Sequence, residues 1–396
     1  MPSARSLRPL TVPAGPRAAT ALPALRRALD GQGDALLPLA PDQDAAPVLR
    51  AMGAEDPLAP GEDDPADPTA LVIATSGSTG TPKGVLLPAS ALRASAEATH
   101  RRLGGPGHWL LAMPAHHVAG IQVLVRSLLA GTRLEAVDGS AGFRPDRFAE
   151  AARRGLAAEG RHYTALVPTQ LRRLLDDADG LAALREFDAV LLGGAATPPA
   201  LRERALAAGV RITTTYGMSE TSGGCVYDGL PLDGVRVHVE ESADGSGPVS
   251  LTGPVLARGY RGRPDSAAFR DGWFRTGDLG RRAGDRLEIL GRADDVIITG
   301  GVNVAPVLVE RLLAEHPAVR EVCVLGVEDP EWGQAVLAAV VPADPADPPA
   351  PEELRALVRE RAGAPSAPKR IEFLAELPLR GPGKPDRRAL RATLGR

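Results

Sequence analysis

The segment Thr75-Ser-Gly-Ser-Thr-Gly-Thr-Pro-Lys83-Gly84 carries residue types that suit a phosphate group. Its glycines let the backbone pass close to a ligand, and its hydroxyl side chains and exposed N–H groups can surround phosphate oxygens. Lys83 adds a positive charge. The order differs from a Walker A loop, because Gly84 stands where that loop has a magnesium-binding hydroxyl. The segment therefore predicts a phosphate-binding loop of another kind, placed between a strand and a helix, rather than a flexible linker.

Three side chains farther along the chain have chemistry that suits a nucleotide. Glu220, in a Gly-containing loop after an apolar run, offers the hard oxygen that Mg²⁺ prefers. Asp278 is an ionised acceptor suited to the two hydroxyls of a ribose. Lys384 lies in a Gly/Pro-rich stretch that can carry a point charge to a remote site. Taken singly, Glu220 and Lys384 are more typical of a solvated loop, and Asp278 is as typical of a turn as of a site, so both interpretations stay open at this point.

Short apolar runs alternate with helical patterns over the region that holds most of these residues. The runs predict strands at 71–74, 109–113, 162–167, 189–192 and 210–215. The patterns between them predict helices at 89–103, 118–129, 169–175 and 199–208. Strands that alternate with helices imply right-handed βαβ units and a mostly parallel sheet.

The pattern of apolar runs and turn residues changes twice after this region. Residues 235–290 consist of short strand-like runs with Gly and Asp turns, which predicts a β-rich subdomain. Apolar runs at 296–299 and 335–341, a helix opened by Asn303 and Pro306, and a helix at 352–361 then predict a small α+β domain. The predicted fold class is α/β, with a large N-terminal domain of mostly parallel βαβ layers plus a β-rich subdomain, followed by a small C-terminal α+β domain.

We place the domains at 1–291 and 292–396. Within the first, residues 1–69 are predicted to be a shortened preamble and linker. The preamble is expected to carry a helix, and the stretch 41–68 is acidic, proline-rich and aperiodic, which is typical of a surface loop.

The composition of the chain argues against a nucleic-acid-binding, a secreted and a membrane-spanning protein. The chain has 396 residues, 46 Lys and Arg against 49 Asp and Glu, and a net charge of −3, so we expect no nucleic-acid partner. Two cysteines, Cys225 and Cys323, cannot form a disulfide framework, and the N-terminal residues lack the apolar run of a signal peptide. The charge-free stretch 104–125 is broken by His, Pro and Gly, which favours a buried strand and helix over a membrane span. We expect a cytoplasmic protein with no integral membrane segment.

The segment 75–84 closely resembles the signature of the adenylate-forming acyl-activating enzymes, which include the acyl-CoA synthetases, the adenylation domains of peptide synthetases and the luciferases. Further motifs follow in that family's order: Leu192-Gly-Gly-Ala195, Thr215-Tyr-Gly-Met-Ser-Glu220-Thr221, Thr276-Gly-Asp278, Gly291-Arg-Ala-Asp294 and Gly383-Lys384. The resemblance runs from about residue 71 to the end. It implies an enzyme that joins a carboxylate to ATP as an acyl adenylate, releases pyrophosphate and transfers the acyl group to coenzyme A.

The resemblance assigns most of the matched residues to ATP. The implied ATP-binding residues are Thr75, Ser76, Gly77, Ser78, Thr79, Gly80, Gly193, Gly194, Ala195, Tyr216, Gly217, Ser219, Asp278 and Arg292. Among them, Tyr216 would pack on the adenine, Ser219 would bind the α-phosphate, and Asp278 with Arg292 would hold the ribose. Glu220 would hold the magnesium ion that bridges the ATP phosphates.

The resemblance also implies how catalysis proceeds. Lys83 and Lys384 would neutralise the negative charge that develops as the carboxylate attacks the α-phosphorus. Asp294 corresponds to a hinge about which the small domain, mobile in this family, rotates between two half-reactions. Gly300 and Gly301 would then face coenzyme A. No protein nucleophile is required, so the cysteines receive no catalytic role, although Cys225 stays a candidate for the pocket lining.

Substrate choice depends on the acyl pocket, where we expect His117, Gly120 and Thr215. In the segment 114–120, His117 is followed closely by Gly120, and this resembles the o-succinylbenzoate–CoA ligases of menaquinone biosynthesis. The segment 167–175 and the short chain point the same way. A dicarboxylate needs a donor for its second carboxylate, and His117 or Arg126 could serve.

Other functions stay open from the sequence. Within the family these are another acyl- or aryl-CoA synthetase and a stand-alone adenylation enzyme that loads a carrier protein. From another class, an inactive ATP-binding regulatory relative is an alternative, against which the intact Lys83, Glu220, Asp278 and Lys384 argue. The sequence does not fix the oligomeric state, and a homodimer stays open.

Overall fold

A computed structural model describes residues 5–41, 44–76, 82–140, 142–242, 245–380 and 384–395. The chain forms two compact units. The first comprises Met1–Gly194, Ala205–Val237 and Ser250–Arg275, and the second Ala195–Arg204, His238–Val249 and Thr276–Arg396. The domain border between 291 and 292 stays a prediction.

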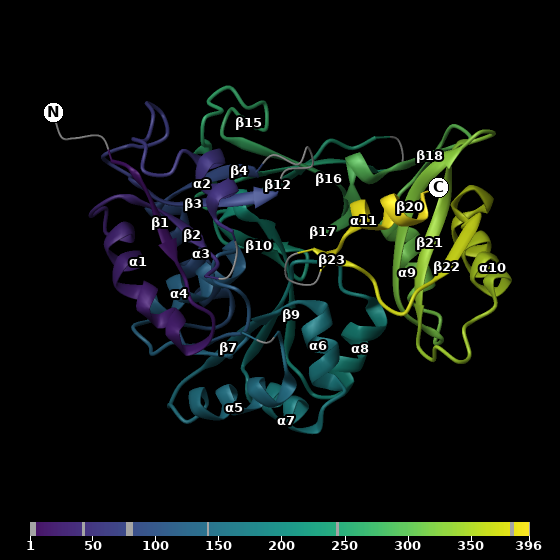
Figure 1. The fold of residues 1–396 in the computed structure, drawn as a ribbon, viewed down its shortest axis with the longest axis horizontal. Coiled ribbons are helices and arrows are strands. Elements are labelled where there is room, and N and C mark those ends of the chain that lie inside the picture. Colours follow the sequence, from purple (N-terminus) through teal and green to yellow (C-terminus); the bar gives the residue numbers. More distant parts are fainter. Residues whose placement is uncertain are drawn as a thin grey trace. The chain divides into compact units, whose positions relative to one another are not determined.

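A seven-stranded sheet, in the order β11-β10-β9-β8-β7-β5-β6, lies in the first unit (Figure 1). Strands β6, β5, β7, β8 and β9 run parallel. The bounds are β5 His108–Leu111, β6 Glu135–Ala136, β7 His162–Leu166, β8 Ala189–Leu192, β9 Ile212–Met218, β10 Gly223–Tyr227 and β11 Leu230–Pro231. All residues of β7 and β8 are buried, as expected for strands covered on both faces. The predicted parallel βαβ units, and with them the α/β fold class, are confirmed.

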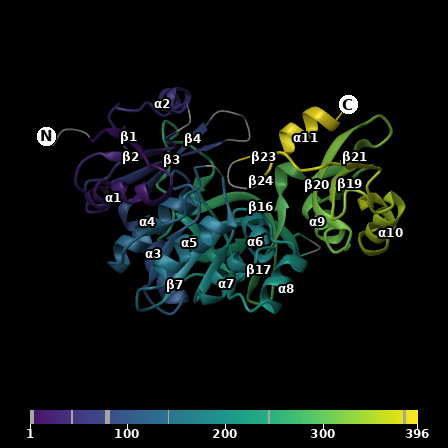
Figure 2. The same ribbon diagram turned by 60° about the horizontal axis from the view of Figure 1, so that its bottom comes forward.

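The predicted helices of this region are also confirmed. They are α3 Ala89–Arg102, α4 Val118–Ala130, α6 Pro168–Leu175 and α8 Pro199–Ala207. Two further helices, α5 Pro145–Gly155 and α7 Ala178–Glu186, were not predicted. Figures 1 and 2 show α3 and α4 side by side, and both contact the seven-stranded sheet. The charge-free stretch forms β5 and α4, as expected. Among the described residues, no helix is both long and apolar enough to cross a membrane.

A second sheet of the first unit has the order β1-β2-β3-β4-β14. Its strands are β1 Leu7–Thr11, β2 Ala35–Leu39, β3 Thr69–Ser76, β4 Pro82–Pro88 and β14 Gly259–Tyr260, and the helices nearby in the chain are α1 Leu22–Leu29 and α2 Ala46–Met52. Strands β3 and β4 are antiparallel. The prediction that the Gly-rich segment separates a strand from a helix is therefore wrong. Val85, Leu86 and Leu87 are buried as a strand, and α3 begins only after them.

The loop predicted at 41–68 is only partly present. Helix α2 lies inside it, with Met52 buried in a core cluster beside Val72 and Leu86. Glu62 is 7 % exposed and forms an ion pair with Arg261. The acidic composition predicted a solvated loop, but one of its acidic side chains, Glu62, is the buried partner of an arginine.

The second unit contains a sheet in the order β19-β18-β21-β20, with β22 beside β21. Its elements are β18 Ile297–Thr299, β19 Val302–Val304, α9 Pro306–Leu313, β20 Val319–Asp329, β21 Gly333–Pro342, α10 Pro351–Ala362, β22 Arg370–Phe373, β23 Leu379–Arg380, β24 Lys384–Pro385 and α11 Arg387–Leu394. Alternate residues of β20 enter two apolar clusters, one with Val309 of α9 and the other with Leu390 of α11. The predicted α+β pattern is confirmed, except that Asn303 lies in β19 and α9 begins at Pro306.

The β-rich stretch expected at 235–290 is present. Its strands are β12 Arg236–Val239, β13 Ser246–Thr252, β15 Phe269–Arg270, β16 Trp273–Ala283 and β17 Arg286–Arg292. In the first unit, β15 pairs with the start of β16 through Phe269 and Phe274. In the second unit, the rest of β16 pairs antiparallel with β17, which places Asp278 opposite Arg292.

Candidate functional site

The carboxyl end of β9 opens into the turn that carries Glu220. The residues at 213–216 are half-buried although β9 lies inside the sheet. A 3₁₀ turn, Ser219–Thr221, follows, and the chain then returns as β10. In open α/β sheets, ligands bind beyond the carboxyl ends of parallel strands. The position of this turn therefore suits a ligand site.

Hydrogen bonds fix the Glu220 turn from several sides. The Thr221 hydroxyl donates to the Gly223 carbonyl at 2.7 Å, and the Ser222 hydroxyl donates to the Val255 carbonyl at 2.9 Å. The Ser222 carbonyl accepts from Ser95 Oγ of α3 at 3.0 Å and from Gln122 Nε2 of α4 at 2.8 Å. Thr221 and Ser222 are fully buried. The turn is therefore held rigidly, which suits a side chain that must meet a ligand in one geometry.

Glu220 and Lys83 meet at one tyrosine ring. The Tyr260 hydroxyl donates to Glu220 Oε1 at 2.7 Å, and Lys83 Nζ lies 5.3 Å from the centroid of the same ring. Tyr260 is 5 % exposed, and Glu220 is half-buried. Glu220 Oε2 makes no hydrogen bond with any described residue. The structure therefore brings two of the predicted catalytic side chains together through a residue that the sequence reasoning missed.

Lys83 also marks one end of the predicted phosphate loop. Thr75 in β3 pairs with Lys83 in β4, and the Thr75 hydroxyl donates to the Lys83 carbonyl at 3.3 Å. Gly77, Ser78, Thr79 and Gly80 lie outside the described residues, as does the side chain of Ser76. The described residues on either side pair as neighbouring antiparallel strands, β3 and β4.

The predicted adenine segment contacts the motif after β8. A side chain at Gly193 would come within 2.4 Å of Thr215 Oγ1, so only glycine permits this approach. Gly194 follows in the same turn, and Tyr216 and Gly217 lie next to Thr215 in β9. Ala195 belongs to the second unit, and Ser219 is 8 % exposed. Gly193, Thr215 and Tyr216 therefore share one end of the parallel sheet.

Helix α4 begins at the predicted acyl pocket. His117 is its N-cap residue, and the His116 and His117 rings lie 4.1 Å apart. Gly120 has a packing reason, since a side chain there would come within 2.3 Å of the Pro114 carbonyl oxygen. Farther along the same helix, Gln122 packs against Gly223 at the start of β10. Helix α4 thus lies beside the Glu220 turn.

Arg126 lies one turn beyond Gln122 and is 4 % exposed. Its guanidinium stacks on the Trp109 ring at 4.9 Å, but it makes no ion pair or hydrogen bond with a described residue, and its buried Nε lacks a partner. Gln122 Oε1 is likewise buried without a partner. Burial lowers the pKa of Arg126, although a guanidinium stays charged in proteins. The helix therefore holds an uncompensated cation.

The charge of Arg126 affects its neighbour His100. Trp109 Nε1 donates to His100 Nε2 at 3.2 Å, which requires this nitrogen to be unprotonated. Burial lowers the pKa of His100 to about 4, with a further contribution from the Arg126 charge. His100 is thus neutral at ordinary pH and adds no second positive charge beside Arg126.

In the second unit, one guanidinium joins the predicted ribose contact to the predicted hinge. Arg292 forms a two-pronged pair with Asp294, at 2.9 and 3.2 Å, and lies 3.5 Å from Asp278. The Asp294 pair raises the pKa of Arg292, and the same pair lowers the pKa of Asp294. Asp278 is 8 % exposed. These three residues, matched in two separate motifs, are therefore brought together.

The remaining predicted residues lie in two hairpins of the second unit. Gly300 and Gly301 both have positive φ and form the turn between β18 and β19, where the Trp332 ring covers Gly300. Lys384 begins β24, opposite Arg380 of β23, just before Asp386 caps α11. The side chain of Lys384 lies outside the described part of the chain.

The donor set of the Glu220 turn fits a magnesium ion that also binds substrate phosphates. Within the described ranges, no group of three or more His, Cys, Asp or Glu side chains could hold a metal ion. Mg²⁺ is usually held by one or two carboxylates together with phosphates and water, so a single carboxylate with an open oxygen matches this pattern. Burial raises the pKa of Cys225 and of Cys323 to about 12, so neither thiol is a ready nucleophile.

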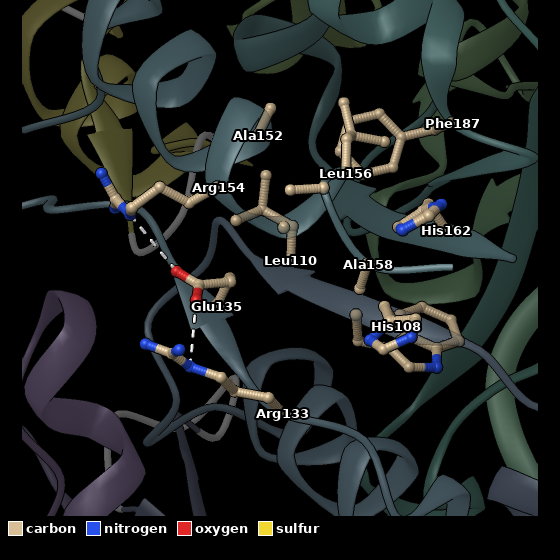
Figure 3. A pocket seen from close by; sticks show the side chains of 13 residues that line it. His108, Leu110, Arg133, Glu135, Ala152, Arg154, Leu156, Ala158, His162 and Phe187 are labelled. Carbon is tan, nitrogen blue, oxygen red and sulfur yellow. Dashed lines mark hydrogen bonds and ion pairs between the residues drawn. The ribbon is translucent and has the colours of Figure 1, made fainter. Parts of the chain in front are cut away.

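A pocket of about 240 Å³ lies at the amino ends of β5 and β7. Its walls include the stacked rings of His108 and His162, and Glu135 pairs there with Arg133 and Arg154 (Figure 3). The predicted site residues lie elsewhere. The pocket is at the opposite ends of the parallel strands from the Glu220 turn. Its two arginines, Arg133 and Arg154, already share the Glu135 carboxylate.

Comparisons with known proteins identify the family of the chain. The family model described as AMP-binding enzyme matches residues 15–261, and the AMP-binding enzyme C-terminal domain matches 308–384. A Mycobacterium tuberculosis H37Rv protein named "Probable 2-succinylbenzoate--CoA ligase" is 47 % identical over 388 residues, which cover 97 % of each chain.

Two solved structures share the fold. The amide bond synthetase McbA from Marinactinospora thermotolerans has a TM-score of 0.84 at 29 % identity and covers 99 % of this chain and 90 % of its own. The o-succinylbenzoate CoA synthetase MenE from Bacillus subtilis, in complex with the acyl-adenylate intermediate, has a TM-score of 0.81 at 24 % identity, with coverages of 98 % and 89 %. The matched family uses ATP and Mg²⁺, with coenzyme A as a substrate of its ligases. The chain belongs to the AMP-binding enzyme family and is an adenylate-forming acid–thiol ligase.

Proposed function

We propose that this chain is the ATP-dependent o-succinylbenzoate–CoA ligase of menaquinone biosynthesis. The observation that carries the choice of acid is helix α4, which begins at His117 beside the Glu220 turn and carries Arg126, a buried cation without a carboxylate among the described residues. o-Succinylbenzoate has two carboxylates, and the one that is not activated can compensate this charge. The name of the 47 % identical mycobacterial relative supports the same acid.

In the proposed reaction, the succinyl carboxylate of the acid attacks the α-phosphorus of ATP, and the bond to pyrophosphate breaks. Lys83 and Lys384 neutralise the charge that develops, and Ser219 binds the α-phosphate. Glu220 holds the magnesium ion, which neutralises and orients the ATP phosphates when bound. Tyr216 packs on the adenine, and Asp278 with Arg292 holds the ribose.

The second half-reaction transfers the acyl group. The thiol of coenzyme A attacks the acyl carbonyl, and the bond to AMP breaks. For this step we propose that the region after the border at 291/292 rotates at Asp294 and presents Gly300 and Gly301 to coenzyme A. His117, Gly120 and Thr215 line the acyl pocket in this proposal. It also assigns the enzyme to the cytoplasm.

Pyrophosphate exchange tests the acid. Each member of a panel that contains o-succinylbenzoate, fatty acids and aromatic acids is incubated with enzyme, ATP and labelled pyrophosphate, and thioester formation is then followed after addition of coenzyme A. We expect exchange and thioester with o-succinylbenzoate. Exchange only with other acids would overturn the choice of substrate. An amide formed with an amine, and no thioester, would overturn the choice of acceptor.

The role of Lys384 can be tested separately in the two half-reactions. In Lys384→Ala, we expect the rate of adenylation to fall roughly 10²- to 10³-fold, because one charged contact to the transition state is lost. Thioester formation from preformed acyl adenylate should be largely retained. Equal losses in both half-reactions would contradict the assigned role.

A further inference from the structure

Tyr260 is the residue through which the two charged groups of the Glu220 turn meet. It lies in β14, which pairs with β4, whose first residues include Lys83. Its hydroxyl donates to Glu220 Oε1 at 2.7 Å, and the Lys83 ammonium lies over its ring at 5.3 Å from the centroid. With 5 % exposure, its phenol is well shielded from solvent.

The surrounding side chains hold the phenol in this place. The Phe269 ring meets the Tyr260 ring edge to face at 5.3 Å, and Phe274 packs on Phe269 at 4.8 Å. On the chain, the next residue is Arg261, whose guanidinium is paired with the buried Glu62 at 2.5 Å. A swing of the hydroxyl away from Glu220 would therefore disturb packing on both sides.

Glu220 and Lys83 have opposite charges, yet the described residues contain no ion pair between them. Lys83 makes no ion pair with any described residue, and the open oxygen of the carboxylate is Oε2. The phenol satisfies both groups with a neutral side chain, since its hydroxyl binds the anion and its ring face binds the cation. Lys83 consequently remains available for a negatively charged ligand, and Glu220 remains available for a metal ion bound to that ligand.

We propose that Tyr260 is a positioning residue for Glu220 and Lys83. Its hydroxyl fixes the rotation of the Glu220 carboxylate so that Oε2 faces the magnesium ion, and its ring keeps Lys83 from pairing with Glu220. The inference rests on the magnesium role proposed above for Glu220. Partners that orient a metal-ligating carboxylate typically change metal affinity or activity by about 10- to 100-fold when they are lost.

The variant Tyr260→Phe tests the hydroxyl alone. ATP binding to the full chain is measured by calorimetry without any acid, over a range of Mg²⁺ concentrations and in EDTA. We expect the Mg²⁺ concentration for half-maximal enhancement of ATP binding to rise about 10-fold or more, while ATP affinity in EDTA is unchanged, because the ring remains. An unchanged Mg²⁺ midpoint in folded protein would overturn the proposal.

The variant Tyr260→Leu tests the ring as well. It removes the face beneath Lys83, so we expect the affinity for ATP in EDTA to fall about 2- to 5-fold in addition to the loss in Mg²⁺ response. Tyr163→Phe is the matched control. Tyr163 is fully buried and its hydroxyl donates to the Leu103 and Gly105 carbonyls, so the variant loses a buried hydroxyl away from the Glu220 turn.

A double-mutant cycle separates positioning from general destabilisation. If Tyr260 acts through the carboxylate, Tyr260→Phe should have no further effect on the Mg²⁺ midpoint in a Glu220→Gln background. Additive effects would overturn the proposal. Glu220→Asp covers the case in which the tyrosine variants do not fold, because it keeps the charge but withdraws it from the hydroxyl. A wild-type midpoint in Glu220→Asp would also overturn it.

The same variants distinguish this inference from the proposed function. If Glu220→Gln alone keeps the wild-type Mg²⁺ midpoint, the magnesium role of Glu220 fails, and the positioning role fails with it. If the acid panel excludes o-succinylbenzoate, the ATP-binding measurements are unaffected, because they contain no acid.

Discussion

Two arginines of the first unit, Arg261 with a side chain 10 % exposed and the buried Arg126, are in opposite states of pairing. Arg261 pairs with Glu62 at 2.5 Å and donates to the carbonyls of Met52, Gly53 and Pro57 at 3.0, 3.1 and 3.1 Å. Arg126 stacks on Trp109 and pairs with no described residue. A saturated guanidinium joins distant segments of the fold, whereas an unsaturated one of similar burial can accept an anion that the described part of the chain does not supply. Burial alone therefore does not separate structural from functional arginines.

The largest effect is expected at Arg261. In Arg261→Met, the buried Glu62 carboxylate loses its charged partner, and the free energy of unfolding should fall by about 3–5 kcal/mol. Urea denaturation measures the loss, and ATP binding by the folded fraction should be retained. A loss below about 1 kcal/mol would place Arg261 with ordinary surface residues and remove one side of the comparison.

The second effect concerns activity. In Arg126→Met, kcat/KM for o-succinylbenzoate should fall by a factor that corresponds to about 2–5 kcal/mol, because the proposed charge pair with the substrate would be lost. Stability should be unchanged or slightly higher, since an uncompensated charge is replaced by an apolar side chain of similar length.

A monocarboxylic analogue without the benzoate carboxylate is the control for Arg126→Met. Wild-type enzyme should prefer the dicarboxylate, and the variant should lose this preference. A similar loss of activity with both acids would contradict a role of Arg126 in substrate recognition.

A third effect is the pH dependence of stability near Arg126. The pKa of His100 is about 4 in the folded protein against 6.5 for an unperturbed histidine, so the unfolded chain takes up the proton first as the pH falls. The His100 contribution to the free energy of unfolding should thus decrease by about 1.5 kcal/mol between pH 6.5 and pH 5 and level off below pH 4.

Two variants, His100→Gln and Arg126→Met, isolate the contribution of His100 and the effect of the Arg126 charge on its pKa. Urea denaturation at both pH values is compared between wild type and His100→Gln, which cancels the other titrating groups. In Arg126→Met the pKa of His100, followed by NMR, should rise toward 6.5 because one lowering charge is gone. An unchanged pKa would show that the charge of Arg126 is compensated after all.

The smallest effect is expected at an exposed arginine. Arg8 pairs with Asp34 at 2.6 Å, close to the 2.5 Å of the Arg261–Glu62 pair, but its side chain is 72 % exposed. In Arg8→Met, unfolding free energy should fall by less than about 1 kcal/mol, because solvent screens the pair. This variant is also the matched control for Arg261→Met, and an equally large loss would show that distance rather than burial determines the effect.

Much of the fold was accessible from the sequence because its signals are local. The runs that became β5, β7, β8 and β9 are apolar and bounded by turn residues, and the helices between them have regular spacing. Strand β2, with the sequence Ala-Leu-Leu-Pro-Leu, was missed because a proline and a short length masked a buried strand. The hairpin of β3 and β4 was missed for a different reason. The pairing of these strands depends on contacts with the rest of the fold, which the local sequence pattern does not reveal.

The residues of the candidate site likewise fall into those that local motifs identify and those that only the folded structure reveals. Glu220, Asp278 and Lys83 could be named from motifs, and their roles remain predictions. Tyr260 could not, because its contact with Glu220 joins residues that are 40 positions apart. Its only sequence signal is an aromatic residue in a chain with 3 % aromatics. The pairing of Arg292 with both Asp278 and Asp294 likewise depends on the register of β16 and β17.

The shared acceptor at Ser222 has a consequence for protein engineering. Its carbonyl oxygen accepts from Ser95 of α3 and Gln122 of α4, so both helices are tied to the turn that carries Glu220. A substitution of Gln122 that removes this hydrogen bond would therefore loosen the Glu220 turn. Arg126 lies one helical turn away and has no such bond, so it can be varied to test the proposed acid preference while Gln122 is kept.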